Sequence, residues 1–207
     1  MIKQLLANSC FNINMMKKIL LVLGILLCTI CSANAYSLPR WTGFPLTVYL
    51  PENPESLVVK SAFENWKGNS KGIARFIYRK SNVAKSTSNI NINFYNKLSS
   101  GKAYELSETF ATRAMYTVGK TNAYYYHVDI NISLRDKDGK LYTRSELYAI
   151  SLQAVGRALG IPCQNGDVGV MVCDEKYNVD SVTKEDYQAL FRVYKRVNKD
   201  EMLKFKN

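Results

Sequence analysis

The sequence predicts an α/β domain, and three observations lead to this class. Short segments with the two-residue alternation of strands occupy much of the chain, an amphipathic helix follows the first of them, and two capped helices lie near the end. The 207 residues are 47% hydrophobic and 22% charged, which suits one globular domain. His127 is the single histidine, so this chain alone cannot build a multi-histidine zinc site.

The first 35 residues have the pattern of an export signal. An uncharged apolar run, Ile19–Cys31, follows a pair of lysines and precedes Ala33-Asn34-Ala35, a small-x-small cleavage pattern. The run has 13 residues, and a bilayer span needs about 18–20. We therefore expect residues 1–35 to be a signal peptide and not a membrane anchor. Translation starting at Met15 or Met16 would leave the same compact leader.

Removing this leader changes the rest of the chain. It takes three of the 28 basic residues and no acidic one, so the net charge falls from +11 to +8. It also takes three of the five cysteines and leaves Cys163 and Cys173, an even pair that suggests a disulfide in an exported protein. We expect a folded domain at residues 36–196, a basic tail at 197–207 and a periplasmic or extracellular location. No nucleic-acid-binding motif accompanies the positive charge, so no nucleic-acid partner is expected.

The first strand and helix follow the leader. Pro45–Leu50 alternates and is rich in β-forming residues, so it predicts a strand. Asn53, Pro54 and Glu55 begin a helix, because they suit the cap, the first helical position and the positive end of the helix dipole. We expect it to end at Gly68. Its apolar face consists of Val59, Ala62, Phe63 and Trp66.

Further strands are expected before the second helix. Arg75–Arg79 and Asn89–Tyr95 are short β-rich segments, and Ala111–Val118 predicts another strand after a polar loop at Asn96–Phe110. In Tyr124–Leu134 one face is apolar and the other polar. The apolar face comprises Tyr126, Val128, Ile130 and Ile132, and the polar face comprises His127, Asp129 and Asn131. A histidine on such a face is expected to be a hydrogen-bonded surface residue and not a metal ligand.

Two capping patterns mark the remaining helices. Thr143-x-x-Glu146 begins a helix that is apolar on most sides, which predicts a buried central helix. Gly160 and Pro162 end it. Thr183-x-x-Asp186 begins a last helix with one apolar face.

Part of the central helix, Gln153–Cys163 (QAVGRALGIPC), resembles the zinc helix of the metzincin metallopeptidases, and within them the matrixin-like secreted peptidases. In their pattern, H-E-x-x-H-x-x-G-x-x-H, the histidines bind zinc, the glutamate is the general base and the glycine turns the chain toward the third histidine. Flanking segments extend the resemblance over Arg40–Lys195. They are Trp41–Tyr49 as first strand, Ala62–Trp66 as first helix, Val170-Met171 as methionine turn and Thr183–Tyr194 as closing helix.

Every chemical position of the zinc motif is changed in this chain. Gln153 and Arg157 stand at the helix-ligand positions, Ala154 at the base position and Cys163 at the third ligand position. Glutamine is a poor zinc ligand, alanine cannot accept a proton, and arginine cannot be deprotonated in a protein. Met171 keeps the turn position, where we expect it to serve packing. We therefore expect no catalytic residue, no bound metal and no cofactor.

The resemblance implies a metzincin-like fold. This is a twisted mixed sheet, mostly parallel with one antiparallel edge strand, with a backing helix, the former zinc helix and a C-terminal helix. The edge strand would be Ala111–Val118, and in active relatives the substrate peptide lies along it. An exposed edge can add a peptide strand without any chemistry. Thr112, Ala114 and Tyr116 are therefore the expected peptide-binding edge.

These features predict an exported pseudopeptidase that binds a peptide or protein in the former substrate cleft, without stable membrane insertion. Two other classes stay open: an active zinc metalloendopeptidase with an atypical site, and a structural envelope interaction protein whose cleft is filled. In the resembled fold a Cys163–Cys173 disulfide would take over part of the metal's structural role. Arg157 either forms a salt bridge with a local acid or anchors a carboxylate in the cleft. The local acids are Asp167, Asp174 and Glu175.

Overall fold

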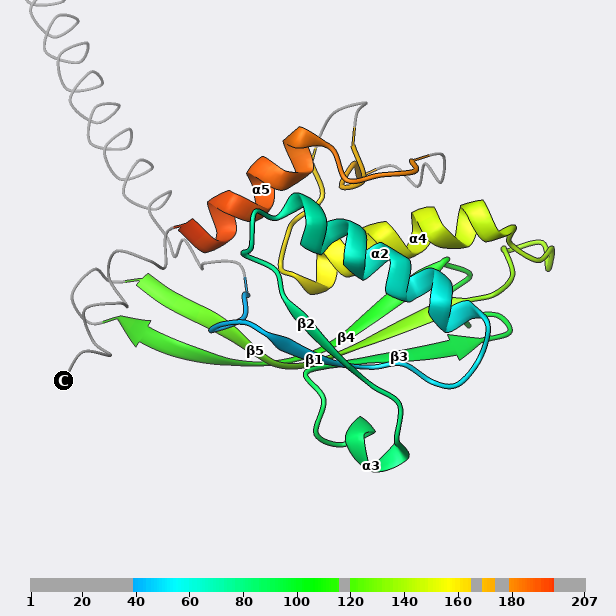
Figure 1. Cartoon of the computed structure of the whole chain (residues 1–207), viewed down its shortest axis with the longest axis horizontal. Coiled ribbons are helices and arrows are strands. Elements are labelled where there is room, and N and C mark those ends of the chain that lie inside the picture. The colour runs from blue at the N-terminus through cyan, green and yellow to red at the C-terminus, as the bar shows by residue number, and fades with distance from the viewer. Residues whose placement is uncertain (1–38, 116–119, 165–168, 174–178, 196–207) are drawn as a thin grey trace, which may run out of the picture. The chain divides into compact units, whose positions relative to one another are not determined.

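The computed structural model describes residues 39–115, 120–164, 169–173 and 179–195 (Figure 1). The chain divides into two compact units. Of the first unit, the described ranges contain only the strand ends at 114–115 and 120–121. All the other described residues belong to the second unit, which carries the sheet and helices. The expected signal peptide and basic tail lie outside the described residues.

A five-stranded sheet forms the centre of this unit. Its strands are β1 (Leu46–Tyr49), β2 (Phe76–Arg79), β3 (Ile90–Tyr95), β4 (Tyr104–Met115) and β5 (Lys120–Ser133). They are ordered β2-β1-β3-β5-β4, with β1 parallel to β2 and β3, and β3 parallel to β5. β4 is the antiparallel strand at one edge. The predicted α/β class, with a mostly parallel sheet and one antiparallel edge pair, is confirmed.

The helices are distributed unequally over the two faces of the sheet. α2 (Glu55–Asn69), α4 (Arg144–Ala158) and α5 (Lys184–Lys195) lie on one side, and the short α3 (Asn82–Lys85) lies on the other (Figure 1). α2 packs directly against α4. The capping box predicted for α4 is present, since Glu146 N–H donates to Thr143 Oγ1 at 3.2 Å and Thr143 N–H donates to Glu146 Oε2 at 2.7 Å.

The polar loop predicted at Asn96–Phe110 is wrong over its second half. Strand β4 already begins at Tyr104, so the strand expected at Ala111–Val118 starts too late. Tyr104 and Leu106 pack against the core. Polar residues follow them on both faces, so the apolar alternation was too short to detect in the sequence.

One residue of β5 does not join the face that the sequence assigned to it. Tyr126 is 67% exposed, whereas Tyr125 is 7% exposed and packs on Trp41 with ring centroids 5.4 Å apart. From Val128 onward the predicted alternation holds. The burial pattern therefore shifts by one residue before Val128, as it does at a β-bulge.

Gly160 ends α4 as the sequence predicts. Its φ angle is +83°, and its N–H donates to Arg157 O at 2.8 Å. The N–H of Ile161 donates to Gly156 O at 3.1 Å. This pair of bonds is a Schellman ending, in which a glycine adopts the left-handed conformation that other residues rarely do.

Two buried side chains from distant segments hold the last turn of α4. The indole N–H of Trp41 donates to Ala158 O at 2.8 Å. The hydroxyl of Tyr194, on α5, donates to Leu159 O at 2.7 Å. Both carbonyls lie where a helix has no further backbone donors of its own. These bonds fix the end of α4 relative to the start of the domain and to α5.

At Gly156 the helix α4 lies in close contact with α2 and with the segment around Met171. A Cβ atom built at Gly156 would overlap Met171 Sδ and would lie 2.6 Å from Trp66 Cζ2. Trp66 is fully buried, and its indole N–H donates to Leu152 O at 2.8 Å. The indole is therefore fixed and cannot easily move away from an added methyl group.

We predict that Gly156→Ala lowers the free energy of unfolding by about 1–3 kcal/mol, because overpacking outweighs the better helix propensity of alanine. The matched control is Gly68→Ala in α2, where an added Cβ meets nothing within 4 Å. That variant should be unchanged or up to about 1 kcal/mol more stable. Denaturant unfolding of both variants measures the difference, and equal effects would contradict the packing argument.

Candidate functional site

An open groove of about 510 Å³ lies between the first half of β4 and the last turns of α4. One wall consists of Lys102 and Tyr104–Glu108. The others consist of Gln153 and Arg157 on α4 and of Cys163, Met171, Val172 and Cys173. The groove thus brings together Gln153, Arg157, Cys163 and Met171, which the sequence pattern singled out.

The other predicted site positions are not among the described residues that line the groove. Ala154 is fully buried and does not line the groove. Thr112 and Ala114 lie in β4 beyond the residues that line it. Tyr116 lies outside the described residues. The strand wall of the groove is therefore the earlier part of β4, at Tyr104–Glu108, which the sequence analysis had assigned to a loop.

Gln153 is engaged by the backbone opposite it. Its side chain is 9% exposed, and its Nε2 donates to Val172 O at 3.0 Å. This bond ties the middle of α4 to the segment that follows Met171. An amide held in this way stabilises the groove wall.

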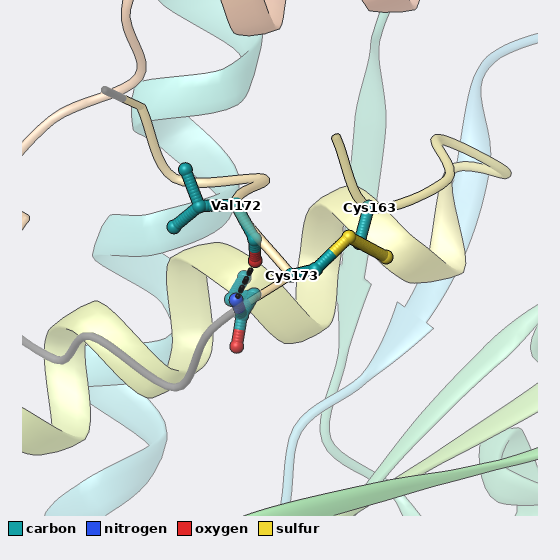
Figure 2. The surroundings of a disulfide bond; sticks show 4 residues. Cys163, Val172 and Cys173 are labelled. Carbon is teal, nitrogen blue, oxygen red and sulfur yellow. Dashed lines mark hydrogen bonds between the residues drawn. A yellow bond between two sulfur atoms is a disulfide. The ribbon is translucent and has the colours of Figure 1, made fainter. Parts of the chain in front are cut away.

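The predicted disulfide between Cys163 and Cys173 is present. The two Cα atoms are 4.8 Å apart, and the bond lies beside the end of α4, close to the carbonyl of Val172 (Figure 2). Backbone bonds flank it, because Gln164 N–H donates to Met171 O at 2.6 Å and Cys173 N–H donates to Gln164 O at 3.2 Å. The covalent link and this short backbone pairing together join the chain leaving α4 to the chain leaving Met171.

Asp186 positions the turn that contains Met171. This aspartate on α5 is 2% exposed, and its carboxylate accepts hydrogen bonds from Val170 N–H at 2.8 Å and Met171 N–H at 2.9 Å. It also accepts from the backbone N–H of Thr183 at 2.9 Å and from the Thr183 hydroxyl at 2.8 Å. The sequence showed only the cap pattern of Thr183 and Asp186. Nothing in the spacing indicated that the same carboxylate would also hold a turn 15 residues away.

The groove-lining residues Glu108 and Arg157 both interact with the buried Tyr125. The Tyr125 hydroxyl donates to Glu108 Oε1 at 3.2 Å. Burial raises the pKa of Tyr125 above its ordinary value, the Glu108 carboxylate raises it further, and the positive charge of Arg157 opposes the rise. The phenol therefore stays protonated and acts as a hydrogen-bond donor at neutral pH.

His127 has the hydrogen-bonded surface role that the sequence predicts. Its Nδ1 lies 2.9 Å from Ser88 O, and its Nε2 lies 3.2 Å from Asp129 Oδ1 and 3.2 Å from Asn91 Nδ2. His127 is not among the residues that line the groove. It belongs to a polar network on β3 and β5.

Within residues 39–115, 120–164, 169–173 and 179–195, no cluster of three or more histidine, cysteine, aspartate or glutamate side chains is arranged to hold a metal ion. In those same ranges no helix is long and apolar enough to cross a membrane.

No protein-family model matches this sequence, and no curated protein sequence matches it. The resemblance to matrixins therefore stays a prediction.

We predict that replacing both cysteines, as Cys163→Ala with Cys173→Ala, lowers the free energy of unfolding by about 3 kcal/mol, because the link restricts the unfolded chain. The protein used should begin at Tyr36, so that these are its only cysteines. Reductant should destabilise the unsubstituted protein and leave the double variant unaffected. Two reactive thiols in the unfolded, unreduced protein would contradict the disulfide.

We predict that Asp186→Asn lowers the free energy of unfolding by about 2–3 kcal/mol. The amide would offer N–H groups to backbone donors that now meet a carboxylate oxygen. The control is Asp180→Asn, because Asp180 is exposed and accepts a hydrogen bond only from neighbouring Ser181, at 3.1 Å, among the bonds of the described residues. This control should change stability by less than about 0.5 kcal/mol. Similar losses for the two variants in denaturant unfolding would refute the special role of Asp186.

Proposed function

We propose that this protein is an exported, matrixin-like domain that binds extended peptides or extended protein segments in the groove beside β4 and does not cleave them. The observation that carries the proposal is the groove itself. It places an edge strand opposite the changed positions Gln153, Arg157 and Cys163. The mostly parallel sheet with an antiparallel strand at its edge is the kind of sheet that the resemblance implies, and it supports the same proposal.

The geometry of β4 suits the addition of a peptide strand. β4 is the last strand of the sheet, and within the described residues no strand pairs with its outer side. The outer N–H and C=O groups of an edge strand are available to another chain. The groove beside Tyr104–Glu108 leaves room for the side chains of such a peptide.

The chemistry of the groove argues against zinc-dependent cleavage. Gln153 is bonded to the backbone, and Ala154 offers no proton acceptor. The guanidinium of Arg157 is a permanent cation and would repel a dication placed beside it by several kcal/mol, even at an effective dielectric constant of about 20. The residues of the former motif therefore support binding without hydrolysis.

We predict that the purified protein binds a series of heptapeptides of alternating valine and threonine that are acetylated at one end and amidated at the other. Fluorescence anisotropy measures the binding. β-branched residues favour the extended form that edge pairing needs. Methylating the backbone nitrogens that face β4 should abolish binding, whereas methylating the alternate nitrogens should not, because those point away from the strand. If both methylated sets bind as well as the parent peptides, strand addition to β4 is excluded and the structural envelope class is favoured.

The same protein sample should contain no stoichiometric zinc and should not cleave an unmethylated member of the series. Near-equimolar zinc, removed by a chelator together with a peptidase activity, would overturn the pseudopeptidase proposal and favour the atypical metalloendopeptidase.

A further inference from the structure

Arg157 has an unusual environment for an arginine. Its side chain is half-buried at the last turn of α4 and lines the groove. The ion pairs found within the described ranges do not include it, and none of the hydrogen bonds there has its guanidinium as donor. The acids Asp167, Asp174 and Glu175, considered as partners from the sequence, lie outside those ranges. A partly desolvated guanidinium with five N–H donors is a strong site for an anion.

The groove is lined by charges of both signs: Lys102 and Arg157 are positive, and Glu105 and Glu108 are negative. Glu108, on the opposite wall, accepts a hydrogen bond from Tyr125. Lys102 lies at the other end of the strand wall, so the groove offers a cation near each end. Without the expected signal peptide the chain has a net charge of +8, which favours encounters with acidic partners through long-range attraction.

The position of Arg157 also selects which part of a peptide would reach it. A strand added to β4 lies in the plane of the sheet, and its side chains point alternately to the two faces. α4 lies over one of those faces (Figure 1). A side chain of the added strand can therefore reach a group on α4. The terminus of the added peptide stays in the plane of the sheet and does not point toward α4.

We propose that Arg157 binds the side-chain carboxylate of a glutamate or aspartate in an extended peptide paired with β4. This inference rests on the proposed function and adds the chemical class of its ligand. A carboxylate accepts two parallel N–H bonds from a guanidinium, which gives both affinity and a fixed position along the groove. The acidic residue would set the register of the peptide, because backbone pairing alone is tolerant of register.

The test uses matched heptapeptides from the valine–threonine series, acetylated and amidated, with either glutamate or glutamine at the central position. The unsubstituted protein should bind the glutamate peptide at least about tenfold more tightly, since a hydrogen bond to a charged group contributes about 1.5–3 kcal/mol. The preference should weaken as salt is raised. A third peptide, with a central glutamine and a free C-terminal carboxylate, should bind no better than its amidated form.

Three variants identify the responsible residue. Arg157→Gln should remove the preference for glutamate, and Arg157→Lys should keep part of it, because lysine retains the charge and loses the paired donors. Arg79→Gln, which removes an exposed charge on β2 at the other edge of the sheet, should leave the preference unchanged. The thermal midpoint of each variant shows whether it is folded. If Arg157→Gln is unfolded, the test rests on Arg157→Lys alone.

The outcomes separate this inference from the proposed function. If no peptide of the series binds, both fail. If peptides bind but glutamate and glutamine are equivalent, the carboxylate anchor is refuted and peptide binding stands. The carboxylate anchor is also refuted, and peptide binding stands, if the preference for glutamate survives Arg157→Gln or if the free C-terminal carboxylate is the preferred group.

Discussion

The close contact at Gly156 determines where the walls of the groove lie. Trp66 from α2 and Met171 both reach the backbone of α4 at this glycine, leaving no room for a Cβ atom. α4 is therefore held against α2 on one side and against the Met171 segment on the other. The groove-lining residues on α4 lie within one turn of this contact. Their positions therefore depend on the packing of Trp66 and Met171 against this glycine.

The segment below the groove is held by two further constraints of different chemistry. Asp186 binds the backbone N–H groups of Val170 and Met171 from inside the domain. The Cys163–Cys173 disulfide joins the same segment to the chain that leaves α4. A buried carboxylate that accepts several backbone donors fixes a turn strongly, because each unpaired donor would be costly. The carboxylate and the disulfide therefore position the Met171 segment from two sides.

The sequence predicts local structure here better than it predicts contacts between distant segments. The capping box at Thr143 and Glu146, the ending at Gly160 and the disulfide all follow from residue types that have few structural alternatives. The start of β4 was missed because Tyr104 and Leu106 alone mark its apolar face. The second role of Asp186 could not be predicted, because a cap pattern does not reveal which other backbone comes near the same carboxylate.

The properties of the groove follow from these constraints taken together. Zinc chemistry needs groups that release protons and approach a dication, whereas Gln153 is bonded to Val172 and Arg157 keeps its positive charge. The groove around them is nevertheless open, and it borders the edge strand of the sheet. Within the described residues the guanidinium of Arg157 has neither an ion pair nor a hydrogen bond, and such a group attracts the lone pairs of a carboxylate and repels a metal cation.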